Sequence, residues 1–155
     1  MKLLQIKIET ATRENLEACY KMLMNSKLGE IYFSDKDPAQ FLAKAIDSRE
    51  ISVAINNENQ TIGFIWAELN GTFGKYPYLH LIVVVDNYRG KGIGQKLISY
   101  FEDVITADYD KVFLMVADFN QRAKKLYESL NYKEAGLLPD FVIDGVDEYL
   151  MMKRK

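Results

Sequence analysis

The sequence predicts one α/β domain in which a mixed β-sheet carries helices on both faces. The chain has 155 residues, the length of a single domain. Strand-like apolar runs are interspersed with stretches whose apolar residues recur every three or four positions. No linker, internal repeat or low-complexity tract separates them. The order β-α-α-β-β-β-α-β-α-β-β requires a mixed sheet, and we expect a single domain over residues 1–155.

The first half of the chain supplies a strand, two helices and a hairpin. Residues 3–9 alternate polar and apolar side chains as a strand does, and Thr12 is placed to cap the following helix. Cys19 falls on the apolar stripe of that helix, which predicts a packing role rather than a catalytic thiol. The remaining elements of this half are a mixed loop at 25–36, a helix opened by Asp37 and Pro38, and strands at 51–56 and 60–69 around the turn residues 57–59.

The second half begins with a strand at 78–85 and a glycine-rich segment that opens a helix. The apolar stripe of this helix is predicted to hold Ile93, Leu97, Phe101, Val104 and Ile105. Residues 111–117 read as a buried strand, and Asn120 is placed to cap the helix after it. Two strands, near 132–138 and 146–153, close the predicted sheet.

The glycine-rich segment Arg89–Gly94, which reads Arg-Gly-Lys-Gly-Ile-Gly, is the most informative part of the sequence. It lies between a β-branched strand and a helix, where the first N–H groups of the helix lack intrahelical partners. Glycines let ligand oxygens approach those groups, so the segment predicts a phosphate cradle. The spacing does not match a P-loop, and the third glycine of a dinucleotide fingerprint is missing. Asp118, at the end of the next strand, is the residue that favours the dinucleotide alternative. The alternative to a phosphate cradle is a glycine turn that serves only to pack the helix on the sheet.

The spacing Arg89-x-x-Gly92-x-Gly94 resembles the Q/R-x-x-G-x-G/A signature of the GNAT superfamily of acyl-CoA-dependent N-acyltransferases. The flanking residues match as well: Val84 precedes Arg89 at the family's spacing, and Asn120 follows the next strand. The segment from Ala123 to Glu128 reads A-x-x-L-Y-E, and Leu130 to Tyr132 stands where the family carries "LGF". The resemblance covers residues 63–132. It implies a mostly antiparallel sheet with a parallel, splayed central strand pair.

The resemblance implies acetyl-CoA as the acyl donor and no metal. It places the pyrophosphate on the N–H groups from Arg89 to Gly94, and the pantetheine arm along the strand before them. The N–H of Val84 would polarise the thioester carbonyl, and Asn120 would hold the far end of the arm. The full set of residues predicted to bind the cofactor is Ile82, Val83, Val84, Arg89, Gly90, Lys91, Gly92, Ile93, Gly94, Gln95, Asn120, Ala123 and Tyr127.

Direct attack of an amine on the thioester needs a proton acceptor for the amine and a proton donor for the thiolate. Tyr127, in the Leu-Tyr-Glu match, is the predicted donor, against the alternative of an interior aromatic. His80, the chain's single histidine, stands where many family members carry a glutamate, and it is one candidate base. Glu68 is the second candidate, and water is the third.

The composition and the loops limit the classes of partner that the sequence predicts. A net charge of −2 gives no electrostatic case for nucleic acid or an anionic membrane. A single cysteine and the absence of an apolar leader predict a cytoplasmic protein, and we expect a monomer or a homodimer. The loop at 138–148 is acidic, with Asp140, Asp144, Asp147 and Glu148, which slightly favours a small cationic amine or amino acid over a protein amine. The competing function is a non-catalytic acyl-CoA sensor or regulatory module.

Overall fold

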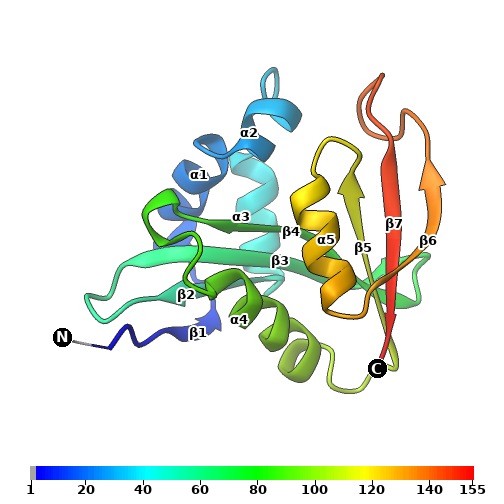
Figure 1. Ribbon diagram of the computed structural model, residues 1–155. Helices are drawn as coiled ribbons and strands as arrows, with labels where there is room; N and C mark the ends of the chain where they lie inside the picture. Colours follow the sequence, from blue (N-terminus) through cyan, green and yellow to red (C-terminus); the bar gives the residue numbers. More distant parts are fainter. Residues whose placement is uncertain (1–2) are drawn as a thin grey trace. The chain divides into compact units, whose positions relative to one another are not determined.

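The computed structural model describes residues 3–155. Its strands and helices follow the predicted order, with one additional short helix (Figure 1). The strands are β1 (Lys7–Thr10), β2 (Ile51–Ile55), β3 (Thr61–Thr72), β4 (Tyr76–Val84), β5 (Lys111–Ala117), β6 (Lys133–Leu138) and β7 (Glu148–Arg154). The helices are α1 (Leu16–Met24), α2 (Lys27–Tyr32), α3 (Ala39–Asp47), α4 (Ile93–Tyr100) and α5 (Gln121–Ser129).

The strands form one seven-stranded sheet in the order β1-β2-β3-β4-β5-β7-β6. The pairs β1–β2, β2–β3, β5–β7 and β6–β7 are antiparallel. Strands β4 and β5 are parallel, with Tyr78 opposite Phe113 and Leu79 opposite Leu114. The predicted mixed, mostly antiparallel sheet with a central parallel pair is therefore confirmed.

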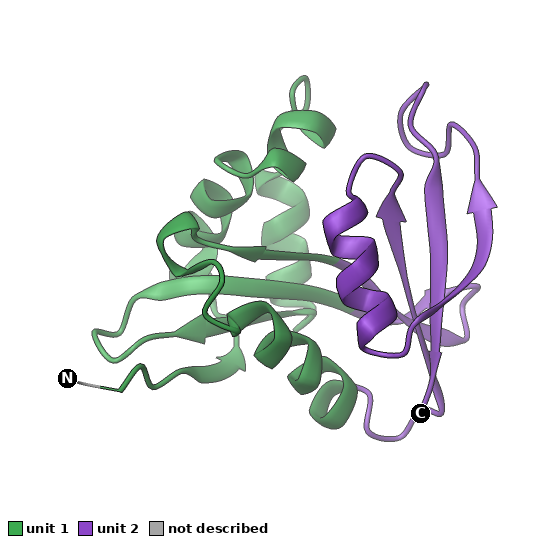
Figure 2. Ribbon diagram, viewed as in Figure 1, with its two compact units in different colours: residues 1–67, 81–105 green, residues 68–80, 106–155 purple. Residues whose placement is uncertain are grey.

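The contacts divide the chain into two compact units, which Figure 2 shows in green and purple. Unit 1 contains residues 1–67 and 81–105, and unit 2 contains residues 68–80 and 106–155. Strands β3 and β4 contribute residues to both units, because the divisions after residues 67 and 80 fall within them. Among residues 3–155, no helix has the length and apolar character needed to cross a membrane.

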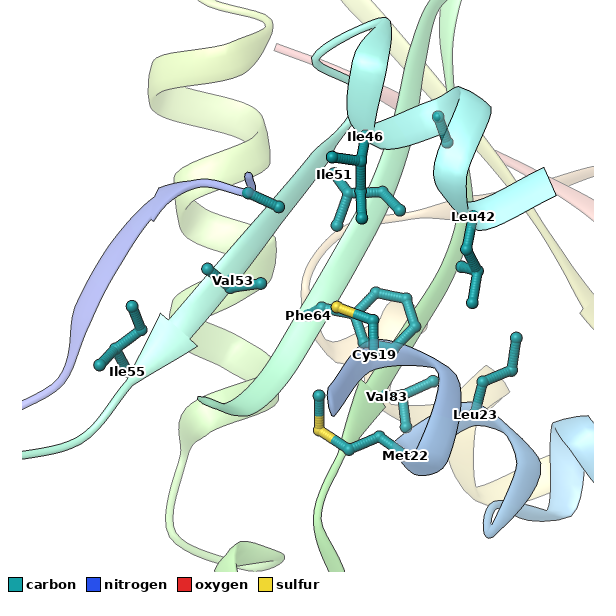
Figure 3. Packing of buried hydrophobic residues seen from close by; sticks show 12 residues of the cluster. Cys19, Met22, Leu23, Leu42, Ile46, Ile51, Val53, Ile55, Phe64 and Val83 are labelled. Atoms are coloured by element: carbon teal, nitrogen blue, oxygen red, sulfur yellow. The ribbon is translucent and has the colours of Figure 1, made fainter. Parts of the chain in front are cut away.

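The core of unit 1 lies between helices α1 and α3 and one face of its strands (Figure 3). Alternate residues of β2 point into this core, as the two-residue period of a strand requires. Cys19 is fully buried in the same cluster, which also contains Phe64, and this confirms its predicted packing role (Figure 3). Burial raises the pKa of the Cys19 thiol to about 12, so the thiol stays protonated at neutral pH.

Helix α4 packs on the opposite face of the unit 1 strands. A Cβ on Gly63 of β3 would lie 3.4 Å from Cδ1 of Leu97 in α4 and 3.1 Å from the carbonyl oxygen of Val83. The bare glycine therefore lets α4 approach the sheet closely. Helices α1 and α3 cover one face of this unit and α4 covers the other, as the sequence predicted.

Two local predictions were wrong. The segment 25–36 is not simply a loop, because it contains helix α2, whose cap Ser26 accepts a hydrogen bond from the N–H of Gly29 at 3.1 Å. A Cβ on Gly29 would lie 1.9 Å from the carbonyl oxygen of Leu23, so only glycine fits this tight junction. Val104 does not join the buried stripe of α4 and is 57% exposed. Residues Phe101–Ile105 form a π-helical turn, whose wider winding changes the phase of the stripe.

In unit 2, α5 lies beside β5, and β7 runs between β5 and β6. Asn120 caps α5, because its side-chain oxygen accepts a hydrogen bond from the N–H of Ala123 at 3.3 Å. This confirms the cap predicted from the sequence. Tyr132, directly after α5, is 2% exposed and packs edge-to-face against Tyr127 with ring centroids 5.7 Å apart.

Candidate active site

The glycine-rich segment joins β4 to α4 within unit 1. Asp86–Tyr88 form a 3₁₀ turn, and Gly92 is the residue before the first helical residue, Ile93. Gly90 and Gly92 have φ angles of +74° and +79°, in the left-handed region that side chains disfavour. The path of the chain into α4 therefore favours glycine at both positions, whether or not a ligand binds.

Gly94 has no such backbone requirement. Its φ is not positive, and apart from the adjoining chain no atom lies within 4 Å of a Cβ placed on it. A glycine in a helix costs about 0.5–1 kcal/mol relative to alanine, so the packing and backbone of the protein give no reason for it. The first backbone hydrogen bond of α4 runs from Lys96 N to Gly92 O at 3.0 Å. The earlier N–H groups of the helix have no intrahelical partner, and such groups at a helix start favour an anionic ligand.

Two cations flank this helix start. Nε of Arg89 lies 3.2 Å from a carboxylate oxygen of Asp86 and 3.4 Å from the carbonyl oxygen of Val84. The ammonium of Lys91 lies 5.0 Å from the ring centroid of Tyr88, a cation–π distance. Arg89 and Lys91 are both exposed, so their positive charges attract an anion to the loop without being buried by the protein itself.

Two residues that the sequence did not single out fix the turn before the glycines. Nδ2 of Asn56 donates to the hydroxyl of Tyr88 at 2.9 Å, across 32 positions of sequence. Oδ1 of Asn56 accepts from the N–H groups of Glu58 and Gln60, which ties the same side chain to the β2–β3 hairpin. Tyr88 is therefore an anchor for the loop. No local pattern could have identified this long-range pair.

A pocket of about 390 Å³ adjoins the end of β4 in unit 1. It is lined mainly by α1 and by the turn that follows β4: Ala18, Lys21, Met22, Asn25, Ser26, Thr61, Val84, Val85, Asp86, Asn87 and Arg89. Val84 and Arg89 were both predicted to contact the cofactor. Val83 points instead into the unit 1 core and is 4% exposed, so any contact it makes with a ligand is through its backbone (Figure 3).

The two rival candidate bases of unit 2 are bonded to each other. Nε2 of His80 on β4 lies 2.9 Å from Oε2 of Glu68 on β3. His80 also packs edge-to-face on Tyr78, with centroids 4.7 Å apart. A carboxylate partner fixes the orientation of an imidazole and stabilises its protonated form. The structure therefore joins as a pair two residues that the sequence offered as alternative bases.

Tyr127 is half-buried on α5, and burial raises the pKa of its hydroxyl to about 12. The pKa of Tyr78 is also raised to about 12, first by burial and then by the charge of Glu148 and by Tyr127. Both phenols therefore remain protonated near neutral pH and are available as hydrogen-bond donors.

The acidic residues before and at the start of β7 are not a uniform rim. Asp140 and Asp144 are exposed and Asp147 is half-buried, whereas Glu148 is only 4% exposed. Asp147 and Asp118 are joined through the N–H of Asp147, which lies 3.2 Å from Oδ2 of Asp118. Glu148 therefore differs from its neighbours in being a buried carboxyl group.

The structure thus gathers Ile82 to Gln95 around the start of α4 within unit 1. Within unit 2 it brings together Glu68 and His80, and it places Asn120, Ala123 and Tyr127 on or at the start of α5.

The sequence matches the model of the Acetyltransferase (GNAT) family over residues 13–132, which is more than half of the chain. The chain belongs to this family. The family match confirms the resemblance that the glycine segment and the Leu-Tyr-Glu segment indicated. It begins in unit 1 and ends in unit 2.

Curated relatives of this GNAT chain include N-alpha-acetyltransferases. The protein of that name from Saccharolobus solfataricus is 30% identical over 107 residues, covering 62% of this chain and 64% of the relative. The chain therefore spans less than two thirds of that relative. The N-alpha-acetyltransferase RimI of Mycobacterium tuberculosis is 24% identical over 96% of this chain and 92% of its own length.

The fold is shared with solved GNAT structures. A chain in the crystal structure of the NatC complex bound to Gag peptide and CoA superimposes with a TM-score of 0.81, covering 97% of this chain and 99% of that chain. Its sequence identity is 17%, so this likeness concerns the fold.

Proposed function

We propose that this protein transfers an acetyl group from acetyl-CoA to a primary amine, and that the amine is the N-terminal α-amine of a protein or peptide. Family membership supports the reaction class. The names of the two curated relatives support an N-terminal amine, over the small cationic amine that the acidic loop slightly favoured.

The observation that carries the proposal is Gly94. The protein contains a helix-weakening residue where its own packing would accept alanine, at the helix end that attracts anions. A pyrophosphate seated on the N–H groups of this turn accounts for the missing side chain. The N–H groups from Arg89 to Gln95 would then hold the pyrophosphate, with Arg89 and Lys91 adding charge.

The amide-bearing arm of the cofactor would lie along Ile82, Val83 and Val84, pairing with their backbone as an added strand would. The N–H of Val84 would polarise the thioester carbonyl, where charge develops during attack. Asn120 and Ala123, at the start of α5, would hold the arm. Asn120 already uses its side-chain oxygen for the helix cap, so its amide nitrogen is the group that would act.

The acceptor amine must lose a proton as its nitrogen forms the new C–N bond and the C–S bond of the thioester breaks. We assign this proton to His80, directly or through a water molecule, with Glu68 orienting the ring and stabilising the imidazolium. Tyr127 would protonate the departing thiolate. Its raised pKa keeps the hydroxyl protonated near neutral pH, so a proton is available when negative charge appears on the sulfur, and solvent would restore that proton afterwards.

The two compact units would act together as one catalytic domain of residues 1–155, since the family match includes residues of both. We propose a monomer or homodimer that acts in the cytoplasm, without a metal and without nucleic-acid or membrane partners.

The second candidate function is a non-catalytic acyl-CoA-binding module. Such a module would bind the cofactor at the same glycine-rich segment, but it would not transfer the acetyl group. Thiol release from acetyl-CoA should be followed with three acceptor sets: peptides with free N-termini, N-terminally blocked peptides containing lysine, and small cationic amines. Transfer to the free N-termini is the expected result. Acetyl-CoA binding with no transfer to any set would favour the binding module, and transfer to small amines alone would overturn the N-terminal assignment.

A further inference from the structure

Glu148 is a carboxylate that the fold withdraws from solvent in unit 2. It is the first residue of β7, and it lies opposite Ala117 of β5 and Leu138 of β6. Its exposed fraction is 4%. Ionised side chains are rarely buried so completely, because desolvating a charge is expensive unless another group interacts with it. The proposed acid–base steps do not use this residue.

Strand register places Glu148 on the same face of the sheet as Tyr78. Tyr78 lies opposite Phe113 in the parallel pair, and Ala117 lies opposite Glu148 in the antiparallel pair. Phe113 and Ala117 are an even number of residues apart along β5, so their side chains leave the same face. Residues opposite each other on neighbouring strands also share a face. His80 extends this row, since its ring contacts that of Tyr78.

The position of Tyr78 is fixed by the β3–β4 hairpin. A Cβ on Gly71 would lie 2.8 Å from Cβ of Tyr78 and 3.1 Å from Oε2 of Glu68. Only a glycine leaves room for both side chains. The hairpin therefore holds Tyr78 beside the Glu68–His80 pair, rather than leaving it free to turn away.

Electrostatic effects on the pKa of Tyr78 link the group of Glu148, Tyr78 and His80 with Tyr127. After burial, the charge of Glu148 is the next largest cause of the raised pKa of Tyr78, and Tyr127 follows. Both Glu148 and Tyr127 therefore affect the pKa of the Tyr78 hydroxyl. Because the two phenols stay neutral, Glu148 supplies negative charge to a sheltered group in which Tyr127 is the proposed proton donor.

Building on the proposed acetyl transfer, we propose that Glu148 binds the positively charged amine of the acceptor and holds it beside Tyr78 and Tyr127. The amine nitrogen arrives as an ammonium and again carries positive charge as its bond to the carbonyl carbon forms. A fixed carboxylate in a sheltered site stabilises that charge more than water does. The transferred protons leave through His80 or solvent, and Glu148 remains ionised throughout.

This assignment makes Glu148 a specificity residue. It selects acceptors that present a primary ammonium and discriminates against the same molecule without that charge. The exposed acids Asp140 and Asp144 contribute at most a long-range attraction that salt screens. The buried carboxylate provides the contact.

The test measures binding rather than turnover. Calorimetry would compare two ligands in the presence of CoA: an acceptor peptide with a free N-terminus, and its des-amino analogue in which a methyl group replaces the ammonium. At about pH 6.5 an N-terminal amine is mostly protonated. We expect the wild-type protein to prefer the cationic peptide by about tenfold or more, as a charge-assisted hydrogen bond would give.

Glu148→Gln should remove that preference by weakening only the cationic ligand. Glu102→Gln is the matched control, since Glu102 is also a buried carboxylate, 8% exposed, but lies in the π-helical turn of unit 1. It should keep the preference. Equal loss for both ligands in folded Glu148→Gln, or an unchanged preference, would overturn the assignment.

If Glu148→Gln does not fold, the wild-type comparison still decides, because a wild type that binds both peptides equally has no such carboxylate contact. A different result would overturn the proposed function itself, namely a wild-type protein that acetylates no amine. Acetylation without discrimination between the two peptides would overturn only the role of Glu148.

Discussion

Nε2 of His80 and Oε2 of Glu68 lie 2.9 Å apart, joining neighbouring strands of unit 2. From the sequence, the two residues were alternative bases. In the structure they are a bonded pair, in which the carboxylate holds the orientation of the ring. The structure therefore changes what a mutation of either residue should do.

We predict that His80→Ala lowers kcat/KM by about 10²-fold near neutral pH, the usual contribution of a general base. Glu68→Gln should lower it by about tenfold, because the ring remains but loses its charged partner. The double variant should be no worse than His80→Ala alone, since the two residues act as a unit. Raising the pH should partly rescue all three variants, because more of the acceptor amine is then neutral.

Steady-state rates across pH 6–9.5 would check this prediction, with Glu58→Gln as the control for loss of an exposed carboxylate. Strictly additive effects of the two substitutions would contradict the coupled pair. If neither substitution changes the pH profile, water accepts the proton.

A second prediction separates binding from stability at the cradle. Gly94→Ala should stabilise the ligand-free protein by about 0.5–1 kcal/mol, because alanine is the better helix former and open space receives its methyl group. The same methyl group should weaken acetyl-CoA binding, because it occupies the space assigned to the pyrophosphate. Gly94→Glu should abolish binding by adding bulk and negative charge.

Gly136→Ala provides the matched control, since Gly136 on β6 also has open space around its Cβ position. Its affinity for acetyl-CoA should not change. Gly92→Glu is a less informative variant, because the φ of +79° strains any side chain there. Undiminished affinity in folded Gly94→Glu would refute the placement of the pyrophosphate.

The strand, turn and helix start of the proposed cradle could be predicted from the sequence because they are consecutive in the chain. A strand, a glycine-rich turn and a helix start follow one another from Ile82 to Gln95, so local rules suffice. The cap at Asn120 is local for the same reason, and its partner Ala123 lies within the first turn of α5.

The missed features depend on residues that only folding brings together. Asn56 reaches Tyr88 across the β2–β3 hairpin, and Gly29 is required by the carbonyl oxygen of Leu23. The burial of Glu148 depends on pairing with two strands at once. In the sequence it stands among solvent-exposed aspartates and carries no sign of being different.

The third prediction concerns Tyr127. Tyr127→Phe should lower kcat by about 10²-fold and leave cofactor affinity nearly unchanged, because the ring still packs against Tyr132. Since burial raises the pKa of Tyr127 to about 12, the hydroxyl remains protonated well above its ordinary range. The wild-type kcat should therefore show no fall caused by this group between pH 8 and about 10.5, within which an unperturbed tyrosine would ionise.

A pH profile of kcat at saturating substrates would test this, provided that chemistry limits turnover. Tyr132→Phe, which removes the neighbouring hydroxyl, should keep most of the activity. A descending limb near pH 10 that disappears in Tyr127→Phe would show that the hydroxyl titrates normally. Full kcat in Tyr127→Phe would make Tyr127 a packing residue.

The fourth prediction is that alkaline pH destabilises the fold partly through Cys19. Its thiol has an ordinary pKa of 9.0, which burial raises to about 12 in the folded protein. Above pH 9 the unfolded chain loses this proton while the folded chain keeps it, so the free energy of unfolding falls as pH rises towards 12. At pH 10.5 the share of Cys19 in this fall is about 2 kcal/mol, from the difference between the two pKa values.

Cys19→Ala should lower stability at pH 8 by loss of packing, yet its further loss between pH 8 and 10.5 should be about 2 kcal/mol smaller than that of the wild type. Tyr78 and Tyr127 also have raised pKa values and are present in both proteins, so their shares cancel in this comparison. Urea unfolding at the two pH values would measure the difference, and parallel losses in the two proteins would mean that the Cys19 thiol reaches solvent in the folded state.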